Sequence, residues 1–176
     1  HQQQMFCDGR NRNCQAFAAR HGFDLLNESA IMTLSRADLD RVPHATALPI
    51  DERYYDQFRH LHPRLMPNTY FTAQQLLDRL DADSHLLIAT HEGELLGYVY
   101  FQAGPGVSEG YIDFVAVAET ARRRGIGTQL VAAAAHNAFD NPDIDFVRLS
   151  VNMSNSPALR LYKKLGFRQE RMMMGF

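Results

Sequence analysis

Arg-Arg-Arg-Gly-Ile-Gly-Thr, at residues 122–128, is the stretch of sequence that decides the fold of this chain. A largely apolar run at residues 111–117 precedes it, and a run rich in small residues at 129–139 follows it. A short apolar run is typical of a buried strand, and the later run places apolar residues at helical spacing. The order therefore predicts a strand, a glycine-containing turn and a helix in direct succession.

A turn of this kind at the start of a helix can hold an anion. The first turn of a helix has unpaired N–H groups and a partial positive charge, and glycine lets a phosphate approach the backbone closely. The three arginines add charge and planar donors at the same place. The chain has neither G-x-x-x-x-G-K-[ST] nor G-x-G-x-x-G, which argues against a nucleotide P-loop and a dinucleotide-binding turn. The pattern present is [Q/R]-x-x-G-x-G, formed by Arg122, Gly125 and Gly127.

A second motif occupies residues 155–167, with the sequence Asn-Ser-Pro-Ala-Leu-Arg-Leu-Tyr-Lys-Lys-Leu-Gly-Phe. It directly follows an apolar run at 146–151, for which we predict a strand. The two motifs, in this order and with a helix and a strand between them, resemble the GNAT family of N-acetyltransferases, which use acetyl-CoA. The resemblance covers approximately residues 85–175.

The resemblance implies an α/β fold with a mixed, mostly antiparallel sheet, a central splay between two strands, and flanking helices. The residue pattern itself predicts strands at 86–90, 95–102, 111–117 and 146–152, and one or two more within 23–34. It predicts helices at 11–21, 51–60, 73–80, 129–139 and 157–165, a linker at 36–52 and a loop at 62–72.

Strand 111–117 is expected to lie beside the cofactor. Strict alternation predicts two faces, one with Tyr111, Asp113, Val115 and Val117 and the other with Ile112, Phe114 and Ala116. In the family, acetyl-CoA lies in the splay, and backbone groups of the positions matching Val115 and Val117 pair with its pantetheine arm. The N–H of Val117 then polarises the thioester carbonyl. Ordinary core packing of the two valines is compatible with this role.

The resemblance also implies that the basic turn binds the pyrophosphate of acetyl-CoA. The residues concerned are Arg122, Arg123, Arg124, Gly125, Ile126, Gly127 and Thr128. The backbone N–H groups from Arg124 through Thr128 are expected to matter more than any one side chain. For Arg123 and Arg124, contact with the 3′-phosphate and exposure to solvent are the alternatives.

Two residues of the second motif match functional positions of the family. Asn155 matches a position that contacts the cofactor, and an Asx turn before the helix is its structural alternative. Tyr162 matches the usual general acid, which protonates the departing thiolate of CoA. A half-buried core tyrosine is the alternative for Tyr162.

The general base is less well defined by the sequence. Asp113 is a carboxylate in a buried strand, where desolvation favours a raised pKa, although structural hydrogen bonding explains it equally well. Glu109 lies further along the same strand and could act through water. Tyr111 stands where some family members have a catalytic Glu, and a water relay without a dedicated base is a further alternative.

Residues 11–23 repeat the length and layout of residues 155–167, with Asn at the start and Gly-Phe at the end of each. A chance helix ending in Gly-Phe is the alternative. The repeat predicts that 1–39 is a partial GNAT-like repeat or an N-terminal extension, and that 40–176 is the acetyltransferase domain. Ala18 stands at the position of Tyr162, so the first copy is expected to be inert. The chain would then be the back end of a tandem protein.

The predicted reaction is transfer of an acetyl group from acetyl-CoA to a primary amine. The amine attacks the thioester directly in a ternary complex, since the core region offers no cysteine for a covalent intermediate. The acceptor is a small molecule or a protein amine. A non-catalytic acyl-CoA-binding or sensing module is the alternative function.

Composition and charge restrict the cell compartment and the classes of ligand that fit this chain. A net charge of -2 argues against general nucleic-acid binding. Cys7 and Cys14 form no C-x-x-C pair, and no membrane-length apolar run or signal peptide is visible, so a cytoplasmic protein is expected. The eight histidines form no metal-binding pattern, and the closest pair, His60 and His62, is expected on the surface.

The final strand of the sheet is expected to be completed by segment 23–34 or by a second subunit, as in a homodimer.

Overall fold

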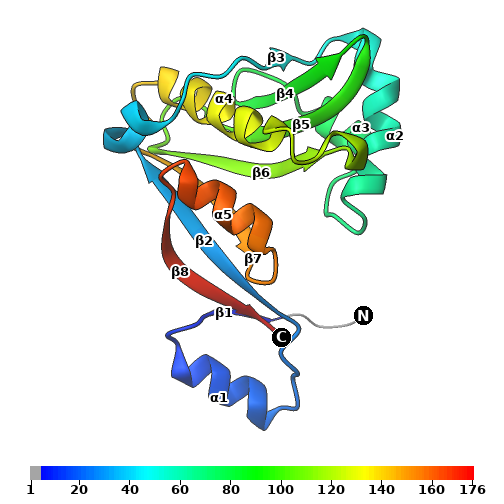
Figure 1. The fold of residues 1–176 in the computed structure, drawn as a ribbon. Coiled ribbons are helices and arrows are strands. Elements are labelled where there is room, and N and C mark those ends of the chain that lie inside the picture. The colour runs from blue at the N-terminus through cyan, green and yellow to red at the C-terminus, as the bar shows by residue number, and fades with distance from the viewer. Residues whose placement is uncertain (1–4) are drawn as a thin grey trace.

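A computed structural model describes residues 5–176, which form one mixed eight-stranded sheet with helices on both faces (Figure 1). The strands are β1 (Phe6–Asp8), β2 (Asn27–Ser35), β3 (Leu48–Pro49), β4 (Ser84–His91), β5 (Glu94–Gln102), β6 (Glu109–Val117), β7 (Phe146–Asn152) and β8 (Arg168–Gly175). The helices of the described part are α1 (Arg12–Arg20), α2 (Tyr55–Leu65), α3 (Ala73–Leu77), α4 (Ile126–Asp140) and α5 (Ser156–Lys164), besides three short 3-10 turns.

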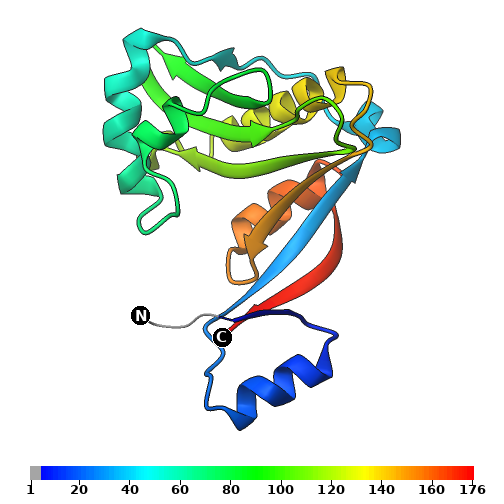
Figure 2. The same cartoon turned by 180° about the vertical axis from the view of Figure 1, so that it is seen from behind.

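The strand order is β1-β8-β2-β7-β6-β5-β4-β3. Within the described residues, β6 and β7 are the one parallel pair, and the other neighbours are antiparallel. Helix α4 covers one face of β4–β6, while α2 and α3 lie on the opposite face (Figures 1 and 2). The predicted fold class is confirmed.

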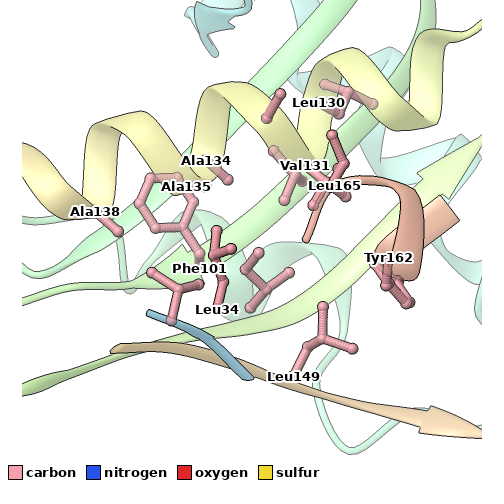
Figure 3. Packing of buried hydrophobic residues seen from close by; sticks show 14 of the residues in the cluster. Leu34, Phe101, Leu130, Val131, Ala134, Ala135, Ala138, Leu149, Tyr162 and Leu165 are labelled. Atoms are coloured by element: carbon pink, nitrogen blue, oxygen red, sulfur yellow. The ribbon is translucent and has the colours of Figure 1, made fainter. Parts of the chain in front are cut away.

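Two cores fill the layers on either side of the sheet. The core beneath α4 is built from its small and branched residues, among them Leu130, Val131 and Ala134, which pack against sheet residues such as Leu149 (Figure 3). The core beneath α2 and α3 is aromatic, and Tyr98 and Tyr100 are fully buried in it. Small side chains on α4 let the helix approach the sheet closely. The sequence run at 129–139, with small residues and apolar residues at helical spacing, is consistent with this packing.

The predicted splay lies between β6 and β7. The two strands pair only from Glu109 opposite Phe146 to Ile112 opposite Leu149. Beyond these residues the strands separate, so the second half of β6 has no strand partner on that side. The sheet therefore opens next to the basic turn that follows β6.

The alternation predicted along β6 is wrong at Asp113. The register with β5 shifts there, because Tyr100 lies opposite Phe114 while the next residue, Phe101, lies opposite Ile112. This β-bulge adds one residue to β6 and reverses the facing of its side chains. As a result, Ile112 packs in the α4 core, whereas Phe114 packs in the aromatic core on the other face.

Strand β2 lies between β7 and β8 and pairs with both. The first alternative for completing the sheet is thus confirmed: the segment predicted at 23–34 forms a single strand, Asn27–Ser35, within the same chain. A 3-10 turn, Arg36–Arg41, and the short β3 occupy part of the predicted linker 36–52. The division into 1–39 and 40–176 stays a prediction.

Helix α2 differs from the predicted helix 51–60 and the predicted loop 62–72. It spans Tyr55–Leu65 and contains Pro63 in its last turn. The surface location predicted for His62 is wrong, since this side chain is 1% exposed. Its ring lies 2.5 Å from the hydroxyl of Tyr98 and 3.0 Å from the carbonyl oxygen of Phe71. These two polar contacts offset the desolvation of the buried imidazole and hold the last turn of α2 in place.

Candidate active site

A cavity of about 850 Å³ opens where β6 and β7 separate. Its walls come from the second half of β6, the basic turn, the start of α4, and one side of α5. It is lined by ten predicted cofactor-binding residues: Val115, Val117, Arg122, Arg123, Gly125, Ile126, Gly127, Thr128, Asn155 and Tyr162. Arg124 is the predicted residue that does not line it. Leu65 and Met66, at the end of α2, also line the cavity, and no pattern in the sequence predicts this.

The basic turn presents the open end of α4 to this cavity. Gly125 is the N-cap residue with φ +81°, and no side chain caps the helix in the described structure. The first backbone hydrogen bond of the helix is donated by the N–H of Gln129 to the carbonyl of Gly125, at 3.0 Å. The N–H groups of Ile126 to Thr128 are therefore free to bind an anion.

The two glycines of the turn serve different purposes. A Cβ at Gly125 would meet no atom within 4 Å, so this residue is required for its left-handed conformation. A Cβ at Gly127 would lie 3.2 Å from Cδ1 of Leu161. Gly127 therefore lets α5 pack closely against the start of α4, which brings α5 to the edge of the cavity.

The strand backbone supplies a second set of free groups. The N–H of Ala118 donates to the carbonyl of Leu96 in β5. Backbone groups of successive strand residues point to opposite sides, so the N–H and C=O groups of Val117 and Val115 point away from β5. That side of β6 has no strand partner beyond Ile112. Arg122 confirms the direction, because its Nε donates to the carbonyl of Val117 at 3.3 Å.

Helix α5 brings two side chains to the cavity. Asn155 caps the helix, since its side-chain oxygen accepts from the N–H of Ala158 at 3.2 Å, and it also lines the cavity. Tyr162 is 9% exposed, and its hydroxyl has no hydrogen-bond partner among residues 5–176. Burial raises the pKa of Tyr162 to about 12, so the hydroxyl stays protonated at neutral pH and is able to donate.

A smaller cavity of about 140 Å³ adjoins the larger one and shares Met66, Val115, Asn155 and Tyr162 with it. Its outer wall is the end of β7, residues 150–152. These β7 residues lie beyond the part of the strand that pairs with β6. A small group placed here would therefore lie against Tyr162 and Asn155.

Asp113 is the carboxylate that lines the smaller cavity. Its two oxygens accept hydrogen bonds from the hydroxyl of Tyr70 at 2.8 Å and the side-chain amide of Gln102 at 2.9 Å. Burial, together with the hydrogen bond to Asp113, raises the pKa of Tyr70, so this donor keeps its proton. The β-bulge at Asp113 turns its carboxylate toward these partners.

Glu109 lies elsewhere. It is at the start of β6, in the part that pairs with β7, and it lines neither cavity. Its carboxylate accepts from Arg148, which also binds Glu170. The structure thus brings Asp113 and Tyr162 together at one site and leaves Glu109 in an ion-pair network on the opposite end of the strand.

No group of three or more His, Cys, Asp or Glu side chains within residues 5–176 is arranged to hold a metal ion. No helix within that range is long and apolar enough to cross a membrane.

Comparison of the sequence with known proteins gives consistent matches. Residues 48–167 match the model of the acetyltransferase (GNAT) family. An N-alpha-acetyltransferase from Sulfurisphaera tokodaii is 32% identical over 114 residues, which are 59% of this chain and 66% of that protein. One from Sulfolobus acidocaldarius is 30% identical over 131 residues, which are 67% of this chain and 76% of that protein.

Solved structures with this fold include a GCN5-related N-acetyltransferase from Sphaerobacter thermophilus, with a TM-score of 0.76, 19% identity, and coverage of 98% of this chain and 57% of that one. A tandem GNAT protein from the clavulanic acid biosynthesis pathway has a TM-score of 0.71 at 17% identity, covering 98% of this chain and 61% of that one. These identities support the fold alone. The chain thus spans about two thirds or less of several of the proteins it matches.

Proposed function

Because the chain belongs to the acetyltransferase (GNAT) family, we propose that it transfers the acetyl group of acetyl-CoA to a primary amine. The observation that carries the proposal is the cavity between β6 and α5. It is lined by an uncapped helix start that follows three arginines and by Tyr162, which also lines the adjoining cavity together with Asp113.

The larger cavity fits a long ligand with an anionic part. The free N–H groups at the start of α4 would bind the pyrophosphate, with Arg122 and Arg123 adding charge. The backbone groups of Val115 and the N–H of Val117, which point away from β5, would pair with the pantetheine arm as an added strand. The N–H of Val117 is then placed to stabilise the oxyanion that forms on the thioester carbonyl.

The chemical step needs a donor and an acceptor of protons. The amine nitrogen attacks the thioester carbonyl carbon, the C–N bond forms, and the C–S bond breaks. The sulfur leaves as a thiolate, which takes the proton of the Tyr162 hydroxyl. The proton lost by the amine passes to Asp113 or to water beside it, since Asp113 is the carboxylate of the adjoining cavity.

The acceptor class is suggested by the relatives, which are named N-alpha-acetyltransferases. We infer that the acceptor here is the α-amine at the N-terminus of a protein. The size of the smaller cavity, about 140 Å³, supports a short first residue, and its position next to Tyr162 supports an amine delivered from that side.

The direct test measures release of CoA thiol with two peptides that differ only in the N-terminus. One has a free α-amine, and the other has a blocked α-amine and one lysine. The proposal predicts turnover with the first peptide and little with the second. Tight binding of acetyl-CoA with no turnover on any amine would instead identify the chain as a non-catalytic acyl-CoA-binding module.

A further inference from the structure

The N-terminal unit, defined as residues 5–32, repeats the element order and the strand register of the C-terminal unit 149–176. Asn155 lies 144 residues after Asn11, and the same offset relates β1 to β7, α1 to α5 and β2 to β8. The sheet register obeys this offset. Cys7 lies opposite Met174, and the pair related to it by the offset, Val151 opposite Ala30, is also present.

The two units are therefore related by a pseudo-twofold axis. Ser29 lies opposite Met173, and these two residues are themselves 144 positions apart, which places the axis between them. Strand β8 lies between β2 and β1 in the same way that β2 lies between β8 and β7. The symmetry is thus a property of the paired strands and extends beyond the similar sequences of the two helices.

Local hydrogen bonds follow the same relation. Each helix is capped by its Asn, which accepts from an N–H three residues later, at 3.0 Å in α1 and 3.2 Å in α5. Each helix ends at a glycine with positive φ, followed by a phenylalanine whose N–H donates back into the helix at 3.0 Å. The equivalent acceptors are the carbonyls of Ala18 and Tyr162.

The two copies differ in what covers them. In the C-terminal unit, Leu165 and Phe167 are each 2% exposed, because α4 packs over this side of α5 (Figure 3). The equivalent residues of the N-terminal unit are His21, which is exposed, and Phe23, which is half-buried. Phe17, the equivalent of Leu161, is 51% exposed.

The edge of the sheet shows the same difference. The end of β7, residues 150–152, lies opposite β6 across the splay, whereas β1, its equivalent, is the edge strand of the described structure, and Phe6 in it is 60% exposed. Helix α1 lies at the far end of the molecule from α4 (Figures 1 and 2). An exposed phenylalanine on α1 and an open strand edge thus occur together on one unit.

We propose that the N-terminal unit is a docking surface for a second acetyltransferase-type core. That core would place a strand parallel to β1 and a helix across Phe17, as β6 and α4 are placed on the C-terminal unit. The symmetry specifies this partner, because it defines the strand, its direction and the helix that must follow it. The inference rests on the fold and does not depend on the proposed reaction.

The symmetry also predicts what the second core could not do. The position of Tyr162 is taken by Ala18, which is fully buried and has no hydroxyl. A core docked on this unit would lack the general acid that we assign to Tyr162. Its contribution would therefore be to bury the surface, or to bind a ligand without turnover.

A duplicated chain tests the proposal. Residues 36–148 are placed directly before Met5 of residues 5–176, so that the new junction reproduces the natural step from 148 to 149. The chain contains no tryptophan, so Phe17→Trp gives a single fluorescent probe on the docking surface. Leu48→Trp, at a residue 59% exposed on β3, is the matched control.

Docking predicts that the emission of Trp at position 17 shifts to shorter wavelength in the duplicated chain and becomes less accessible to acrylamide. The probe at position 48 of the original copy is expected to stay exposed. A second duplicated chain carries His21→Leu, which restores the residue type that α4 meets in the C-terminal unit. If the probe at position 17 stays as exposed in both duplicated chains as in the single chain, the proposal is overturned.

Discussion

Replacement of Tyr162 by phenylalanine separates the catalytic role that we propose for this residue from its structural one. The hydroxyl makes no hydrogen bond within residues 5–176, while the ring packs 5.8 Å from that of Phe167, centroid to centroid. Tyr162→Phe removes the oxygen and keeps the ring. We therefore expect the free energy of unfolding to change by about 0.5 kcal/mol or less.

The effect on turnover is expected to be large. A positioned general acid contributes about 100-fold to 10,000-fold to the rate, which corresponds to about 3–5 kcal/mol of transition-state stabilisation. Since the pKa of Tyr162 is raised to about 12, the acid is lost only as the pH rises toward that value. The wild-type kcat should not fall between pH 7 and 10 through loss of this proton.

Tyr98→Phe is the matched control. Its hydroxyl lies 2.5 Å from a ring nitrogen of His62 in the buried core, away from both cavities. Loss of this bond is expected to cost about 1–3 kcal/mol of stability with little change in kcat. The assay is steady-state thiol release together with urea unfolding of both variants. A less than threefold loss of kcat in Tyr162→Phe would refute the assigned role.

Three further changes have expected outcomes. Gly125→Ala should lower the free energy of unfolding by about 1–2 kcal/mol and weaken CoA binding. Gly93 has a similar positive φ and equally open surroundings, so Gly93→Ala should lower the stability as much but leave the affinity for CoA unchanged. Urea unfolding measures the stability of each variant, and calorimetry measures its affinity for CoA. Arg36→Ala should lower the free energy of unfolding by about 2–3 kcal/mol in urea, because Arg36 donates to the carbonyls of Phe139 and Asn141 at the end of α4 and of Ile144 in the turn after it. Burial lowers the pKa of His62, so the unfolded chain binds more protons and the free energy of unfolding should fall as the pH drops below about 6.5. His62→Gln should flatten this dependence and His60→Gln should not; an unchanged slope in His62→Gln would contradict the assignment.

The sequence predicted the elements that local pattern controls. The strand, turn and helix around Gly125 occur as predicted, because glycine conformation and helical periodicity act over a few residues. The splay agrees with the family resemblance. Asn155 and Tyr162 line the cavity, and the roles assigned to them stay predictions. The capping role of Asn155 and its place at the cavity are both present, so its two interpretations were compatible.

Features that depend on distant contacts were missed. The bulge at Asp113 arises from pairing with β5, and no residue in β6 marks it. His62 is buried because Tyr98 and a backbone carbonyl supply its polar contacts from other elements. Met66 reaches the cavity only because α2 continues past Pro63, which local propensity rules place at a helix end.

Calorimetric titration of the folded chain with CoA and with pantetheine tests the central claim most directly. The two ligands share the thiol arm, and only CoA carries the diphosphate that the start of α4 is expected to bind. Our account predicts one CoA bound per chain and a much weaker interaction, or none, with pantetheine. Absence of CoA binding to the folded chain, or equal affinity for the two ligands, would contradict it.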